Sequence, residues 1–278
     1  MRRLIARILP SGLKHLLHYT HNSVLDGIDF VTGRCIPMVP PRRKIFIGGG
    51  DFQAAGTAFL KTLERHTLIK PSAHILDMGS GQGRMALPLT GYLEPTGEYH
   101  GVEIVPSAVD WCNKEYADLK NFHFHHADIH NNYYNPDGKL TAAHYRFPFA
   151  DNSFDLTFLT SVFTHMYTPA IEQYLAEIYR CLKPGGECLA TFFLLNDLSI
   201  AASASAQARL RFEHAVDGLS ATTTPKNPED AIAVNEAYLT DLLAQKGFTV
   251  NTIRYGYWTG QAPAETFQDF IVATANKD

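Results

Sequence analysis

Short apolar runs alternate with stretches of helical periodicity from about residue 45 to the C-terminus. The apolar runs predict strands over 73–78, 98–104, 121–125, 154–160, 187–195, 249–255 and 266–273. The helical spacing between them predicts helices over 52–67, 83–92, 107–116, 171–182 and 235–246, with a chain break at the KPGG cluster, 183–186. Strands that alternate with helices in this way form parallel sheets, so the pattern predicts an α/β fold.

Two segments do not follow the alternation. Residues 130–147 are polar and rich in tyrosine and asparagine, and residues 196–234 pass from a helical stretch into a polar loop. Both follow predicted strands and therefore leave the sheet at its carboxyl edge, where open α/β sheets bind ligands. We expect an N-terminal arm (1–44), one domain (45–278), and within it a cap or lid inserted after the fifth strand (196–234).

The charge of the chain is unevenly distributed. The net charge is −4, but residues 1–44 carry eight basic and two acidic residues, which leaves −10 on the rest. Within the arm, one face of a predicted helix is apolar (Leu4, Ile5, Ile8, Leu9), while Pro10 and Lys14 interrupt any secretory signal. This arm suits a transit peptide, a helix in peripheral contact with a membrane, or a basic helix packed on the acidic body, and the composition favours the last.

Other features of the composition exclude several classes of protein. No run of about 18 apolar residues is present, so we expect no transmembrane helix. The four cysteines, without any CxxC spacing, argue against a zinc site or a disulfide framework and favour a cytoplasmic protein. The acidic body, without a basic stripe, argues against a nucleic-acid partner.

Three glycines alternate directly after the first strand, in the stretch DMGSGQG, 77–83. Gly79 is expected to make the turn, Gly81 to let a ligand approach the backbone, and Gly83 to let the helix pack on the strand. A dinucleotide site would need G-x-G-x-x-G, with a third glycine at the position of Arg84. A glycine-rich turn without a ligand is the remaining alternative.

This stretch resembles the D/E-x-G-x-G-x-G signature of class I S-adenosylmethionine (SAM)-dependent methyltransferases. The resemblance continues in order through FPFADNSFDLTFLTSVFTHM and EIYRCLKPGGECLATFF and spans about residues 46–276. It implies a Rossmann-like, seven-stranded, mostly parallel sheet with helices on both faces. It also implies SAM as the cofactor, with S-adenosylhomocysteine as the product, and contacts of Asp77, Gly79, Ser80, Gly81 and Gly83 with the methionine and ribose parts of SAM.

Acidic residues end the second and third strands as well. Glu103 could accept both ribose hydroxyls, as the corresponding acid does in NAD sites, with Ile104 beside it. The resemblance assigns the adenine amino group to Asp128 and a ring nitrogen to the amide of Ile129. Each acid could instead be a surface carboxylate or a helix cap.

The fourth strand ends in TSVFTHM, where the resemblance implies the transfer site. Thr160 and Ser161 are expected to line it. His165 is a candidate general base, because imidazoles titrate near neutrality. It could also only orient the loop or contact SAM, and this alternative is favoured. The histidines at 123, 125, 126 and 130 lack ligand spacing, so we expect no metal.

The acceptor is expected to be a small or medium-sized metabolite, glycan or lipid, methylated on a hydroxyl oxygen. The aromatic residues of YGYWTG, 255–260, could hold such a substrate or could be core residues. Two other functions stay open: a catalytically silent SAM-binding regulatory or partner protein, and an NAD-dependent oxidoreductase. The fold does not determine the acceptor, because one fold hosts many chemistries.

Overall fold

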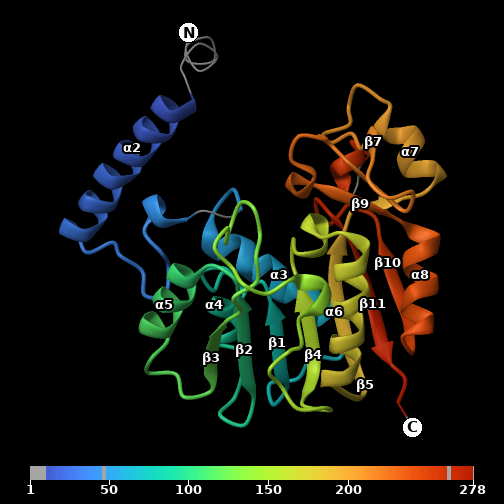
Figure 1. Cartoon of the computed structure of the whole chain (residues 1–278). Helices are drawn as coiled ribbons and strands as arrows, with labels where there is room; N and C mark the ends of the chain where they lie inside the picture. The colour runs from blue at the N-terminus through green and yellow to red at the C-terminus, as the bar shows by residue number, and fades with distance from the viewer. Residues whose placement is uncertain (1–10, 46–47, 262–263, 278) are drawn as a thin grey trace.

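The computed structural model describes residues 11–45, 48–261 and 264–277 (Figure 1). Its main sheet has seven strands in the order β10-β11-β5-β4-β1-β2-β3. Only β11 is antiparallel to its neighbours, so the predicted mostly parallel sheet is confirmed. The strands are β1 (His74–Met78), β2 (Glu98–Glu103), β3 (Phe122–His126), β4 (Phe154–Leu159), β5 (Leu182–Phe192), β10 (Phe248–Arg254) and β11 (Asp269–Ala275).

Helices cover both faces of this sheet, as predicted (Figure 1). On one face lie α3 (Phe52–His66), α4 (Ala86–Leu89) and α5 (Pro106–Glu115), and they share a core with Ile75 and Tyr99 of the central strands. On the other face lie α6 (Thr168–Cys181) and α8 (Glu236–Gln245), whose apolar stripes pack against Leu76 and Met78. Successive residues of β1 thus contribute to different cores, as the two-residue period of a strand requires.

A second, four-stranded sheet lies beyond the end of β5, in the order β6-β9-β8-β7. The predicted cap, 196–234, supplies most of it. The elements are β6 (Leu194–Leu195), α7 (Asp197–Ser203), β7 (His214–Ala215), β8 (Ser220–Thr222), the short helix η4 (Pro228–Asp230) and β9 (Ile232–Asn235). The carboxylate of Asp269 on β11 ties this sheet to the main one, because it accepts hydrogen bonds from the amide of Leu194 (2.7 Å) and the indole of Trp258 (2.9 Å). The function of this segment as a lid stays a prediction.

Three predicted boundaries were wrong. The helix expected over 83–92 is only the single turn α4, because Pro88 has no N–H to continue the helical ladder. The KPGG cluster does not precede β5 but lies inside it. The register between β4 and β5 jumps from Phe154↔Leu182 to Leu156↔Glu187, so these four residues bulge out of the strand pairing. The last strand also lies further along the chain than the expected range 266–273.

The arm contains α2 (Ser11–Val31) and the short helix η1 (Arg42–Lys44). The two pack together through Asp26, which accepts hydrogen bonds from the amides of Arg42 (2.8 Å) and Arg43 (3.2 Å). In Figure 1, α2 stands away from the sheet. The apolar positions predicted over 4–9 lie outside the described residues. None of the described helices is long and apolar enough to span a membrane.

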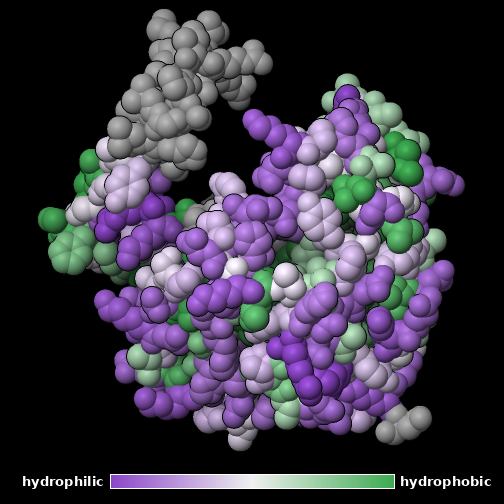
Figure 2. All heavy atoms as spheres, in the orientation of Figure 1, coloured by the Kyte–Doolittle hydropathy of each residue, from purple (hydrophilic) through white to green (hydrophobic). Residues whose placement is uncertain are grey.

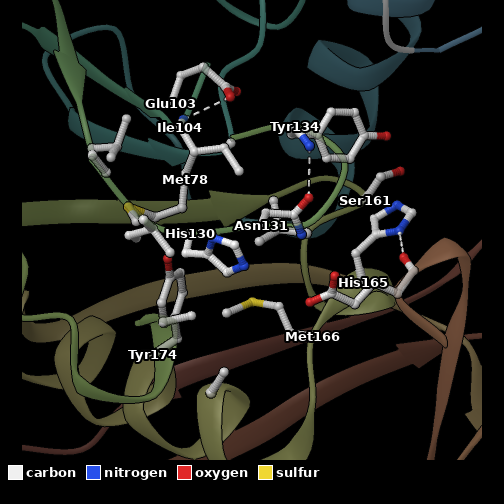
Figure 3. Close-up of a pocket in the computed structure, with 18 of the residues that line it drawn as sticks. Met78, Glu103, Ile104, His130, Asn131, Tyr134, Ser161, His165, Met166 and Tyr174 are labelled. Atoms are coloured by element: carbon white, nitrogen blue, oxygen red, sulfur yellow. Dashed lines mark hydrogen bonds between the residues drawn. The ribbon is translucent and has the colours of Figure 1, made fainter. Parts of the chain in front are cut away.

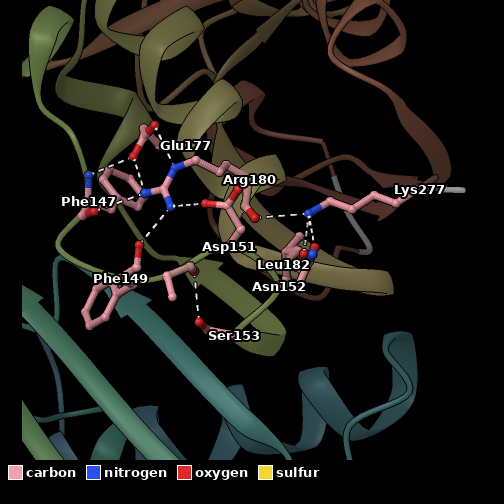
Figure 4. Close-up of polar contacts among 10 residues, drawn as sticks. Phe147, Phe149, Asp151, Asn152, Ser153, Glu177, Arg180, Leu182 and Lys277 are labelled. Carbon is pink, nitrogen blue, oxygen red and sulfur yellow. Dashed lines mark hydrogen bonds and ion pairs between the residues drawn. The ribbon is translucent and has the colours of Figure 1, made fainter.

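A partly buried arginine, Arg180, fixes the loop between residues 147 and 153 against α6 (Figure 4). The guanidinium of Arg180 binds both carboxylate oxygens of Glu177 (3.1 and 2.6 Å) and donates to the carbonyls of Phe147 (3.0 Å) and Phe149 (2.8 Å). Five donors in a planar fork allow one side chain to hold several acceptors at once. This arrangement stabilises the entry into β4, and so the strand that leads to the site.

Candidate functional site

A cavity opens at the carboxyl edge of the main sheet (Figure 3). Its walls come from the ends of β1, β2, β3 and β4, from the start of α6, and from the cap. Seven of the twelve predicted site residues line it: Gly79, Glu103, Ile104, Ile129, Thr160, Ser161 and His165. The other five, Asp77, Ser80, Gly81, Gly83 and Asp128, are not part of its wall.

The glycine turn follows β1 and is held by β2, because the amides of Gly79 and Ser80 both donate to the carbonyl of Val102 (2.7 and 3.0 Å). Gly79 (φ 85°) and Gly83 (φ 76°) lack room for a side chain. A Cβ would lie 2.4 Å from Val162 at the first and 2.9 Å from the Tyr116 hydroxyl at the second. At Gly81 (φ 54°) no atom lies within 4 Å of the Cβ position. The middle glycine therefore faces open space, as expected of a position that a ligand approaches.

Asp77 lies beneath this turn and is fully buried. Its Oδ2 accepts a hydrogen bond from the Tyr99 hydroxyl (2.6 Å), whereas Oδ1 has no partner, and neither has the buried hydroxyl of Ser80. Burial raises the pKa of Asp77 to about 8, against the opposing effect of the Tyr99 hydrogen bond. Asp77 therefore does not reach the cavity directly, and its predicted contact with the cofactor would need a bridging water.

Glu103 ends β2 and reaches across to the glycine turn. Its Oε2 accepts from the amide of Gly81 (2.8 Å), and its Oε1 accepts from the amides of Ile104 (2.8 Å) and Val105 (2.9 Å). Burial raises the pKa of this carboxyl, and the three amides oppose the shift. A carboxylate has about four acceptor positions, so one remains for a ligand. Two ribose hydroxyls would require the side chain to release a backbone amide.

The adenine side of the predicted site is only partly assembled. Ile129 lines the cavity, but its amide donates to the carbonyl of Ala127 (2.7 Å). The backbone carbonyl of Asp128 accepts from the amides of Lys139 and Leu140 (3.0 and 2.9 Å), while its half-buried side chain stays outside the cavity wall. The roles assigned to both residues stay predictions.

Ser161 has an unusual backbone at the end of β4. Its φ of 59° is rare for a residue with a side chain. The amide donates to the hydroxyl of Thr191 (2.8 Å), and the hydroxyl donates to the side-chain oxygen of Gln268 (3.0 Å). Neighbouring strands thus hold a strained residue at the cavity, which is where such strain is commonly found.

His165 lies in the short helix η3 (Phe163–His165), with its ring at the cavity (Figure 3). Its Nδ1 lies 2.7 Å from the backbone carbonyl of Glu229 in the cap. Because a carbonyl oxygen only accepts, Nδ1 carries the hydrogen, and in the neutral ring Nε2 is then a proton acceptor. The ring of Tyr134 meets the imidazole edge to face, with centroids 6.4 Å apart.

Much of the cavity wall was not predicted. The segments expected at the edge, 130–147 and the cap, do contribute wall residues: His130, Asn131, Tyr134, Ala142 and Glu229. Met78, Met166, Ala170 and Tyr174 were not predicted as site residues. No local pattern separates these residues from ordinary core positions. The aromatic loop 255–260 is not part of the wall. Trp258 is fully buried against Phe193 and Phe212, so it belongs to the core under the cap.

The histidines on β2 and β3 also belong to packing. The rings of His100 and His125 stack, with Nδ1 of the first 3.0 Å from Nε2 of the second. Burial lowers the pKa of His125 to about 4. Within the part of the chain that the structure describes, no group of three or more potential ligands could hold a metal ion.

Comparison with known proteins identifies the class of this domain. Residues 76–190, from β1 into β5, match the family model of a methyltransferase domain. This segment includes the glycine turn, Glu103, Asp128 and His165. The matched segment is thus a methyltransferase domain of the class I SAM-dependent type, whose cofactor is SAM.

Individual relatives support this assignment. A sterol 4-C-methyltransferase of Caenorhabditis elegans, strm-1, is 27% identical over 70% of this chain and 51% of its own length. A sterol 24-C-methyltransferase of Schizosaccharomyces pombe, erg6, is 28% identical over 47% and 32%. The chain thus spans about half or less of these two relatives. A SAM-dependent methyltransferase from Methanosarcina mazei has the same fold, with a TM-score of 0.53 and 19% identity over 77% of this chain and 98% of its own.

The residues at the turn fit this cofactor. Two buried polar atoms, Asp77 Oδ1 and Ser80 Oγ, have no hydrogen-bond partner beside a glycine that faces open space. Buried polar atoms are normally paired. A ligand with several donors, or the water that accompanies it, would satisfy them.

Replacing Gly81 by alanine tests whether the open space is a ligand position. Both Gly81→Ala and Gly83→Ala place a side chain at positive φ, which costs roughly 1–2 kcal/mol. Only Gly83→Ala also clashes with Tyr116. We expect Gly81→Ala to weaken SAM binding at least about tenfold in calorimetry with a modest change in Tm, and Gly83→Ala to lower Tm further. Unchanged SAM affinity in Gly81→Ala would contradict the assignment.

The buried Asp77 predicts a dependence of stability on pH. Its ordinary pKa of 3.8 in the unfolded chain rises to about 8 on folding, so folding takes up a proton between these values. The contribution of Asp77 to stability therefore falls as pH rises from about 4 to about 8. Asp77→Asn removes this loss. We expect the difference in Tm between the variant and the unsubstituted protein to shift in favour of the variant as the pH rises from 5 to 8. A Tm difference that stays constant over this range would show that Asp77 is ionised in the folded protein.

Proposed function

We propose that this protein transfers a methyl group from SAM to a small, largely apolar molecule bound in the cavity at the carboxyl edge. The observation that carries this proposal is the wall of that cavity. Glu103 and the glycine turn form one side, and apolar residues form the other, among them Met166, Ala170 and Tyr174. Apolar walls with a few polar groups are typical of small-molecule sites.

The relatives support an apolar acceptor. Two of them are named as sterol methyltransferases, and a sterol would suit a wall of this kind. The acidic body argues against a nucleic-acid acceptor. We therefore favour a lipid-like metabolite over a glycan.

Bound SAM would supply a methyl group on a sulfonium centre, ready for in-line transfer. The protein's own contribution is then chiefly to align the acceptor and exclude water. Ser161, held by Thr191 and Gln268, fixes the wall at the end of β4. The cap contributes Glu229 to the opposite wall.

His165 is the proposed general base for a hydroxyl acceptor. Its Nδ1–H donates to the carbonyl of Glu229, which leaves Nε2 able to take a proton from a substrate. This geometry favours the catalytic role over a purely structural one. General base catalysis typically contributes about 10²–10⁴-fold in rate.

A carbon acceptor is the second candidate, because both sterol methyltransferases are named for transfer to carbon. The same histidine could remove the proton that such a transfer releases. The product distinguishes the two: an O-methyl ether or a new C-methyl group, identified by NMR and mass spectrometry.

A cytoplasmic location is also proposed. All four cysteines are free thiols, with only Cys35 exposed. Free cysteines suit a reducing compartment, whereas the fold itself carries no information on location.

The activity is tested by incubating the protein with methyl-labelled SAM and a panel of sterols and other hydroxylated apolar compounds. We expect label in an organic-soluble product and release of an equal amount of S-adenosylhomocysteine. In parallel, SAM but not NAD should raise Tm. Stabilisation by SAM without turnover of any compound in the panel would favour a silent SAM-binding protein, and stabilisation by NAD would favour an oxidoreductase.

Replacing His165 separates chemistry from cofactor binding. His165→Asn keeps a donor that can reach Glu229 but removes the base, so we expect kcat to fall about 10²–10⁴-fold with the Kd for SAM nearly unchanged. The control is His144→Asn, an exposed histidine of the helix η2 (Ala142–His144) outside the cavity wall. A loss of SAM affinity that accounts for the lower rate would assign His165 to cofactor binding instead.

A further inference from the structure

Over residues 19–31, the helix α2 exposes apolar side chains along one face. Val24, Ile28 and Val31 follow the i, i+4, i+7 spacing of that face, and they are 63%, 48% and 84% exposed. These three residues form the apolar face of the arm. Tyr19 and Phe30 are exposed as well, but they lie on the flank of the helix next to Asn22 and Asp26.

The polar side of the helix faces the protein. Asn22 and Asp26 are buried, and Asp26 binds the amides of Arg42 and Arg43 and also the guanidinium of Arg43 (3.2 Å). A surface helix normally has the opposite orientation, with its apolar stripe on the core. The apolar face of the arm therefore requires a partner outside the described chain.

The charge of the arm identifies the chemistry of that partner. The two acids of α2 are both paired with arginines, Asp26 with Arg43 and Asp29 with Arg42. Residues 1–44 still carry a net charge of +6. An apolar helix face on a segment of net positive charge is the pattern of helices that lie in the interface of an anionic membrane. Pairing of two arms across a symmetric dimer would instead bring two charges of +6 together.

A second exposed apolar site lies on the cap. Leu198 and Ile200 of α7 are 76% and 53% exposed. In Figure 1, α2 and α7 both extend beyond the carboxyl edge of the sheet, on the side where the cavity lies. Figure 2 shows hydrophobic side chains at the lower left end of α2 and on the cap at the upper right. Both sites thus lie on the side of the carboxyl edge.

We propose that the arm docks this protein onto an anionic lipid surface, with the apolar face of α2 inserted among the headgroups and α7 as a second contact. Docking would place the carboxyl edge next to the bilayer. The inference concerns binding alone and does not depend on the identity of the methyl acceptor.

The test is flotation of the full-length protein with vesicles of phosphatidylcholine, alone or mixed with phosphatidylglycerol. We expect binding to the mixed vesicles, weaker binding to phosphatidylcholine, and weakening by salt. The double variant Ile28→Ser/Val31→Ser should lose about tenfold or more in partitioning, because two apolar side chains leave the lipid. Arg34→Glu/Lys44→Glu should weaken binding to the mixed vesicles only.

Leu68→Ser is the matched control. Leu68 is 77% exposed but precedes β1, at the opposite edge of the sheet. The partitioning of the Leu68→Ser variant onto vesicles should therefore stay within about twofold of that of the unsubstituted protein. All substituted residues are exposed or outside the core, and circular dichroism and SAM binding verify the fold. Absence of vesicle binding, or equal binding of the Ile28/Val31 variant, overturns the proposal. A dimer in sedimentation velocity that this variant dissociates would overturn it too, in favour of a second copy as the partner.

Discussion

One carboxylate, that of Glu103, connects the turns at the carboxyl edge of the main sheet. Glu103 accepts the amide of Gly81 from the turn after β1 and the amides of Ile104 and Val105 from the turn after β2. The first turn is held at its start by the amides of Gly79 and Ser80 on the carbonyl of Val102. Nothing packs against Gly81 in its middle, so there the hydrogen bond that Glu103 accepts fixes the turn. The same side chain lines the cavity, so the group that orders the turn also faces the ligand.

Three acids at this edge share a common physical situation. Asp77, Glu103 and Asp269 are all buried, and burial raises the pKa of each. Glu103 and Asp269 are surrounded by donors that favour the ionised form, whereas Asp77 has the Tyr99 hydroxyl alone and one oxygen without a partner. A buried acid left incompletely paired destabilises the folded chain. Asp77 thus keeps a buried oxygen without a partner directly under the glycine turn.

The sequence was sufficient to predict what depends on local spacing. The alternation of strands and helices, the glycine turn and the acid at the end of β2 all follow from periods and motifs that one strand or turn contains. It was insufficient where tertiary packing decides. The helix after the turn is one turn long because Pro88 interrupts it. Trp258 could have been a substrate contact by its residue type, but it is fully buried, and its indole donates a hydrogen bond to Asp269. Nothing near Glu229 in the sequence indicates that its carbonyl meets a histidine 64 residues earlier.

That last contact links the cap to the chemistry. The Nδ1–H of His165 is directed to the carbonyl of Glu229, so the proton-accepting state of Nε2 depends on where the cap lies. The cap is anchored at its base, where the amides of Leu194 and Gly256 and the indole of Trp258 converge on Asp269. Its far end, near η4, touches the site only through Glu229 and its neighbours. A displacement of that end would leave the fold intact, because Asp269 holds the base, yet would free the imidazole to rotate or change tautomer. Under the proposed function, His165 would be competent as a base only with the cap over the cavity, and the cap would then also exclude water from it.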